Sequence, residues 1–109
     1  AGARLLRFLV DDYFDDPGLD KVNRALFAFA AYNAGPAKIR RLRKEAQEMG
    51  FDPNIWFGNV EVAVAKRVGR ETTQYVSNIY KYYLAYRLAG DIAQQREQAT
   101  KKAKASSQN

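Results

Sequence analysis

The sequence contains neither cysteine nor histidine, and these two absences exclude several kinds of chemistry. Without cysteine the chain can form no disulfide and no thiolate nucleophile. Without histidine it lacks the general base of Ser-His-Asp and Cys-His sites, and the usual ligand of zinc and non-haem iron. Carboxylates and tyrosines are then the main side chains for proton transfer, and we expect neither a metal nor a cofactor.

Long apolar runs are absent as well, since no stretch approaches the roughly 20 apolar residues of a membrane span. The 109 residues suit one domain, and their 7 Tyr, 6 Phe and 1 Trp can supply a packed core. The net charge of +6 favours anionic partners: nucleic acid, acidic lipid or an acidic cell-wall polymer. Charge alone does not choose among these three.

Apolar residues recur at helical spacing and strand alternation is missing, so we predict an all-α fold of about five helices plus a polar tail. Asp20 is placed to cap the second helix through its side chain. Large apolar residues almost vanish after Leu88. We therefore expect one domain over residues 1–89 and a tail over 90–109 that is either a frayed helix or disordered. The expected helices cover residues 2–14, about 20–34, 37–49, 59–68 and 70–88.

Two short segments combine polar and aromatic residues in an unusual way. Ala31-Tyr32-Asn33-Ala34-Gly35-Pro36 has the residues of a helix C-terminus, because Asn and Gly tolerate left-handed backbone and Pro often follows. Glu71 and Tyr75 lie four residues apart, so they share one face of a helix. A carboxylate beside a phenol can orient a sugar hydroxyl or a second carboxyl. The alternative is a first-turn Glu favoured by the helix dipole beside an ordinary core tyrosine.

Two charged clusters have simpler interpretations. The basic run from Lys38 to Lys44 can contact phosphates or form a solvated helix face, and the second is the commoner case. The four aspartates Asp11, Asp12, Asp15 and Asp16 lack the alternating spacing and central Gly of a calcium loop. We expect no nucleic-acid partner, and a basic helical nucleic-acid-binding domain remains the most distant alternative.

Taken in order, several segments resemble the SLT-type lytic transglycosylases, the goose-lysozyme-like enzymes that cut bacterial peptidoglycan. Ala31-Tyr32-Asn33-Ala34-Gly35 is similar to the third family motif, and Glu71-Thr72-Thr73-Gln74-Tyr75-Val76 to the element that supplies the fourth-motif tyrosine. The opening Ala1-Gly2-Ala3-Arg4-Leu5-Leu6 resembles the helix after the second motif. Trp56-Phe57-Gly58-Asn59-Val60-Glu61 and Asn78-Ile79-Tyr80-Lys81-Tyr82-Tyr83 resemble the membrane-bound lytic transglycosylase F branch. The likeness covers residues 1 to about 88.

The resemblance implies the C-terminal part of a lysozyme-like domain with a groove for the glycan strand. In the family, one glutamate protonates the β-1,4 bond between N-acetylmuramic acid and N-acetylglucosamine. The muramyl 6-hydroxyl then closes a 1,6-anhydro ring, so the cleavage is not hydrolytic. The resemblance also implies a place in the bacterial cell envelope, on the periplasmic side, with any outer-membrane attachment supplied by other regions.

Five residues carry the family's substrate-binding roles by resemblance. Tyr32 and Asn33 would line the groove floor beside the cleaved bond, and Gly35 would let the backbone approach closely. Tyr75 would hydrogen-bond and orient the catalytic glutamate. Glu71 would lie near the peptide-stem side of the groove or brace the pocket.

The sequence departs from the family in lacking the Glu-Ser motif that carries the catalytic glutamate and the Gly-Leu-Met-Gln motif that follows it. We therefore expect no catalytic residue in these 109 residues, no activity of the chain alone, and a fragment of the catalytic domain. Loss of the first helices would expose the central helix around Phe27, Ala30 and Ala31, so we expect as partner either the missing N-terminal part or a second copy. The other function class is an inactive peptidoglycan-binding module.

Overall fold

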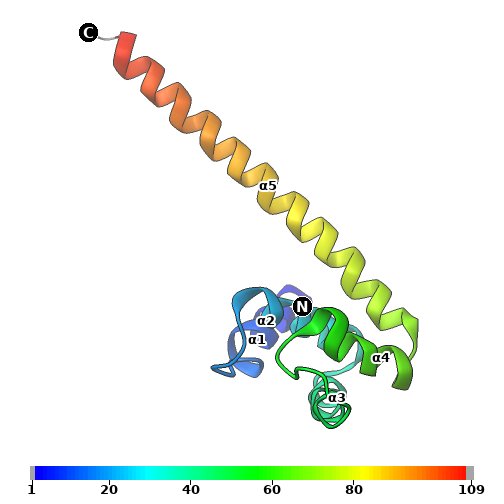
Figure 1. The fold of residues 1–109 in the computed structure, drawn as a ribbon. Helices are drawn as coiled ribbons and strands as arrows, with labels where there is room; N and C mark the ends of the chain where they lie inside the picture. The colour runs from blue at the N-terminus through cyan, green and yellow to red at the C-terminus, as the bar shows by residue number, and fades with distance from the viewer. Residues whose placement is uncertain (1, 108–109) are drawn as a thin grey trace. The chain divides into compact units, whose positions relative to one another are not determined.

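The computed structural model describes residues 2–107, without the side chains of residues 2, 3, 6, 10 and 107. Ala1 and the Leu6 side chain of the opening family-like segment thus lie outside the described residues. Over the described range the chain contains only helices and turns (Figure 1). This confirms the all-α prediction, with five α-helices and two π-helical turns. They are α1 (Gly2–Phe8), η1 (Leu9–Tyr13), α2 (Lys21–Ala34), α3 (Pro36–Glu48), η2 (Trp56–Val60), α4 (Glu61–Arg67) and α5 (Arg70–Ser107).

The chain divides into two compact units, residues 1–79 and 80–109. Helix α2 is the centre of the first unit. Asp20 caps it as predicted, because its Oδ1 accepts a hydrogen bond from the Asn23 N–H at 2.7 Å. All residues from Leu26 to Ala31 are buried. A helix buried on most sides needs neighbours around it, and η1, α3, η2 and α1 all contact α2.

An aromatic core covers α2. Phe14 stacks on Phe27 with ring centroids 6.1 Å apart, and Trp56 meets Phe27 edge-on at 5.9 Å. The predicted exposure of the central helix is therefore wrong: Phe27 and Ala30 are 0% exposed and Ala31 is 2% exposed. Phe14 packs against this helix within the unit, and so do the turn at η1 and the indole of Trp56. The helix face that was expected to be exposed is therefore covered within the unit.

The basic run on α3 separates into two kinds of residue. Lys38, Arg40, Arg41 and Lys44 are exposed, whereas Arg43 is only 8% exposed. The Arg43 guanidinium donates from Nε to the Pro53 carbonyl at 2.8 Å and from Nη2 to Asn54 Oδ1 at 2.9 Å. Its Nη1 pairs with Asp16 Oδ2 at 3.0 Å, and its Cζ lies 4.8 Å from the Phe27 ring centroid. We call these five residues the Arg43 cluster.

Helix α3 also contacts α4, and the two helices cross, since α3 is seen end-on where α4 lies across the view in Figure 1. The loop before α4 packs down onto the domain at Trp56, whose backbone N–H donates to Asn23 Oδ1 at 2.8 Å. The chain then turns at Gly58, where φ is +71°. An ion pair between Arg67 Nε and Glu45 Oε2 at 3.2 Å joins α4 to α3.

Helix α5 does not end at Leu88, where the sequence led us to expect its end, but continues to Ser107. Its residues from 80 onward form the second unit, in which Tyr82 and Tyr86 are 74% and 82% exposed. Tyr80 and Tyr83 stack on each other with centroids 6.4 Å apart. None of the helices within residues 2–107 combines the length and apolar character needed to cross a bilayer.

Candidate functional site

The end of α2 and the start of α5 meet, which brings together two motif segments about forty residues apart. The Thr72 hydroxyl donates a hydrogen bond to Asn33 Oδ1 at 2.8 Å. Thr72 is only 2% exposed, so this bond is shielded from water on the Thr72 side. We call Tyr32, Asn33, Gly35, Thr72 and Tyr75 the motif corner.

Gly35 sets the shape of this corner. Its φ of +104° and ψ of +135° lie in a region that side-chain-bearing residues rarely adopt. Its N–H donates to the Ala31 carbonyl at 2.8 Å and ends α2, and Pro36 begins α3 directly afterwards. The segment is therefore a helix C-terminus in conformation. A Cβ built at Gly35 would meet no atom within 4 Å, so the backbone angle rather than packing calls for glycine.

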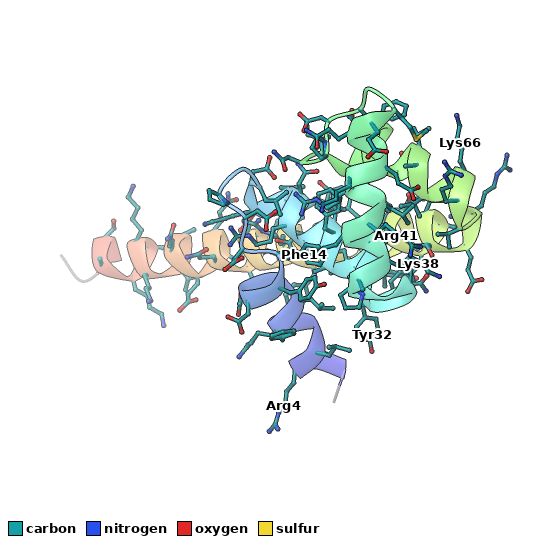
Figure 2. All side chains as sticks on the ribbon, turned by 90° about the horizontal axis from the view of Figure 1, so that it is seen from below. Arg4, Phe14, Tyr32, Lys38, Arg41 and Lys66 are labelled. Carbon is teal, nitrogen blue, oxygen red and sulfur yellow. The ribbon has the colours of Figure 1, made fainter. Side chains whose placement is uncertain are left out.

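The two tyrosines of the corner differ in their surroundings. Tyr32 is 42% exposed, and Figure 2 shows it projecting from the end of α2. Tyr75 is half-buried, and this burial raises the pKa of its phenol, with a smaller contribution from the nearby Tyr32. At neutral pH the phenol is protonated, as any tyrosine is, and can donate a hydrogen bond to a carboxylate.

Glu71 stands apart from the other predicted site residues. It is exposed in the first turn of α5 and, within the described residues, makes no hydrogen bond to the motif corner. Asn33 is thus bonded to Thr72, and Tyr75 lies near enough to Tyr32 to interact with it electrostatically, whereas no such contact joins Glu71 to these residues in the described part of the chain.

Sequence reasoning missed Thr72 and Arg43, although their spacing carried a signal. Thr72 lies four residues before the buried Val76, so both fall on the inward face of α5. Arg43 falls in the register of the buried residues Ile39, Leu42 and Ala46 of α3. A polar residue in an apolar stripe indicates a buried polar contact, and both residues make one.

Comparisons with known proteins agree with the resemblance to lytic transglycosylases that was inferred from the motifs. One curated relative, from Desulfosudis oleivorans, is 34% identical over 91 residues, which cover 72% of this chain. Another, from Shewanella woodyi, is 33% identical over 95 residues and 75% of this chain. A third, from Shewanella loihica, is 36% identical over 73 residues and 55% of this chain. Each is named membrane-bound lytic murein transglycosylase F.

The chain spans about a fifth of these relatives, 19% in the first two cases. No family model matches the chain, and no solved structure gives a significant match. The resemblance inferred from the motifs is nevertheless confirmed: over about three-quarters of its length, this chain is similar to membrane-bound lytic murein transglycosylase F.

Proposed function

We propose that this chain is part of the catalytic domain of a peptidoglycan lytic transglycosylase, and that the motif corner forms one wall of its glycan groove. The observation that carries the proposal is the hydrogen bond between Thr72 and Asn33. It joins the two segments that match the family's third and fourth motifs, in a chain similar to a murein transglycosylase over most of its length.

The corner offers the groups that such a groove needs. Tyr32 presents an exposed aromatic ring, on which a sugar ring can stack, and Asn33 is exposed beside it. The Tyr75 phenol is protonated at neutral pH and is therefore a hydrogen-bond donor. It would orient the carboxyl group of the catalytic glutamate, while Gly35 would allow the strand to approach the backbone. Glu71 would lie at the peptide-stem side.

The proposed reaction needs one carboxyl group that this sequence does not contain. The glutamate of a Glu-Ser segment protonates the glycosidic oxygen, and the bond to the muramyl C1 breaks. The resulting carboxylate then takes the proton of the muramyl 6-hydroxyl. The oxygen of that hydroxyl bonds to C1 in the same step, which gives the 1,6-anhydro product. No residue of these 109 is catalytic in this scheme, so we expect the chain alone to be inactive.

The partners follow from the same scheme. One is the glycan strand of peptidoglycan in the bacterial cell envelope, and the other is a segment that carries the Glu-Ser and Gly-Leu-Met-Gln motifs. We assign residues 1–89 to the catalytic domain and residues 90–109 to a polar tail, whose described part, to Ser107, continues α5. Helix α1 has two exposed apolar side chains, Leu5 at 48% and Phe8 at 47% exposure. They are available for packing against the segment that carries the Glu-Ser and Gly-Leu-Met-Gln motifs.

A chimera tests this function. The chain is joined behind a family segment with the Glu-Ser and Gly-Leu-Met-Gln motifs, and release of 1,6-anhydro-muropeptides from purified sacculi is measured. We expect release from the chimera and none from the 109-residue chain. Tyr75→Phe should slow release about tenfold or more, because a hydrogen bond to a charged group contributes about 1.5–3 kcal/mol. Tyr82→Phe, at an exposed tyrosine of the same helix, should leave the rate unchanged.

Two outcomes would count against the proposal: turnover by the 109-residue chain alone, or a Tyr75→Phe chimera as fast as its parent. A chimera that binds sacculi but never cleaves them would favour the inactive binding module instead.

A further inference from the structure

A second site lies on the first unit, and it shares no residue with the motif corner. A cavity of about 260 Å³ opens beside α3. This volume is just below the roughly 300–1,000 Å³ of pockets for drug-sized ligands, so the cavity suits a small group. Six of the side chains that line it are polar: Asp16, Arg40, Arg43, Lys44, Gln47 and Asn54.

The cavity carries uncompensated positive charge. Asp16 neutralises Arg43, because their side chains form an ion pair at 3.0 Å. Arg40 and Lys44 have no carboxylate partner among the described residues. The cavity therefore holds two cations in excess, four residues apart on one face of α3.

The Arg40 guanidinium is held in place before any ligand arrives. Its Nη2 donates to the Tyr13 carbonyl at 2.8 Å, and its Cζ lies 4.5 Å from the centroid of the Tyr13 ring. Two contacts on one planar group limit its rotation, so less side-chain entropy is lost when an anion binds. Its remaining N–H groups can donate to an oxyanion.

We propose that this cavity binds the carboxylate of an acidic peptide. The Arg40 guanidinium would donate two hydrogen bonds to it, and Lys44 would be the second cation. A carboxylate matches the planar guanidinium in two parallel hydrogen bonds. Inorganic phosphate can meet the same two cations, so the test below includes it as the competing anion. The amide groups of Gln47 and Asn54 suit the peptide groups on either side. The choice of a peptide rests on the proposed function, since peptidoglycan carries peptides.

The test uses the whole 109-residue chain and two isosteric probes. N-acetyl-Ala-Glu-amide carries one carboxylate, and N-acetyl-Ala-Gln-amide is its neutral counterpart. We expect the acidic probe to shift the amide NMR signals of α3 near Lys44 and Gln47 saturably, and the neutral probe to leave them unmoved. Lys44→Gln should weaken binding roughly three- to fivefold, as expected for one exposed ion pair. Arg40→Lys, which keeps the charge but not the two parallel donors of the guanidinium, should weaken binding of the acidic probe by a similar factor.

Lys38→Gln is the matched control, because it removes the same charge from the same helix at an exposed position that does not line the cavity. Equal weakening by Lys38→Gln and Lys44→Gln would overturn the proposal in favour of nonspecific attraction. Equal binding of the two probes, or tighter binding of inorganic phosphate, would overturn it as well.

Failure of this proposal is distinguishable from failure of the proposed function. Glycan strands stripped of their peptides test the motif corner alone, whereas the dipeptide probes test the cavity alone. Loss of one binding activity leaves the other measurable in the same sample.

Discussion

The Arg43 cluster and the motif corner are both polar regions of the first unit, but they are built in opposite ways. The cluster makes three hydrogen bonds and a cation–π contact around one guanidinium that is 8% exposed. Within the described residues the corner has one hydrogen bond between side chains, and its Tyr32 is 42% exposed. The Arg43 guanidinium thus has many contacts and little access to solvent, whereas Tyr32 and Asn33 of the corner are exposed.

The difference separates a buried guanidinium that holds the fold from exposed groups that are available to a ligand. Removing one partner of a buried charge network leaves the others without compensation, so the cluster should matter for stability. Groups that remain exposed around a single bond add little to folding. Their arrangement is better explained by contact with a partner, such as the glycan strand proposed above.

The largest expected effect comes from breaking the cluster. Arg43→Met keeps an unbranched apolar stem and removes the guanidinium, which leaves the Pro53 carbonyl, Asn54 and Asp16 without their donor. We expect the free energy of unfolding in urea to fall by about 3 kcal/mol. A loss below about 1 kcal/mol, the net value of a typical hydrogen bond, would show that the cluster is not a structural centre.

Two controls make that result specific. Arg41→Met removes an exposed charge from the same helix and should change the unfolding free energy by no more than about 0.5 kcal/mol. Thr72→Val removes the bond of the motif corner in a side chain of the same shape and should cost about 1 kcal/mol. A larger loss from Thr72→Val than from Arg43→Met would reverse the comparison.

An intermediate effect is expected at Gly35. Gly35→Ala should cost about 2 kcal/mol, because alanine is strained at this backbone angle even though its Cβ would have room. Gly90→Ala is the matched control, since Gly90 lies within α5 and its Cβ would also meet nothing. Thermal unfolding should show Gly90→Ala unchanged or slightly more stable. Equal melting temperatures for Gly35→Ala and the parent would show that the corner tolerates a different backbone angle.

The smallest effect concerns pH and Tyr75. Burial raises its pKa in the folded chain, so above about pH 10 the unfolded chain loses this proton first. The unfolded state then binds fewer protons, and stability from this group falls as pH rises through the folded pKa. The parent should lose more unfolding free energy than Tyr75→Phe between about pH 9 and about pH 11. Parallel losses in the two proteins would show that Tyr75 does not have a raised pKa.

Helical spacing and capping chemistry were enough to predict much of the fold. The Asp20 cap, the helix stop at Gly35 and the helical class follow from local residue preferences, and the structure confirms them. The end of the last helix at Leu88 was wrong, because loss of apolar residues does not break a helix where no proline follows. The burial of Phe27 also had to come from the structure, since it depends on Phe14 and Trp56 reaching it from distant segments.

The candidate site was predictable only as separate segments. Motif order indicated Tyr32, Asn33 and Tyr75, but the bond that joins the segments runs through Thr72, which has no charge or aromatic ring to draw attention. The contacts of Arg43 span 10 to 27 residues of sequence, and no local pattern gives their partners. Residue spacing along the chain therefore does not predict polar contacts between distant segments.

Trp56 is the one tryptophan of the chain, and its side chain is 0% exposed against Phe27. Its indole is therefore a built-in fluorophore in the same aromatic core on which Arg43 rests. Excited selectively, it would emit at short wavelength in the folded chain and shift to longer wavelength when water enters that core. Unfolding of the first unit can thus be followed optically, without a label and at low protein concentration.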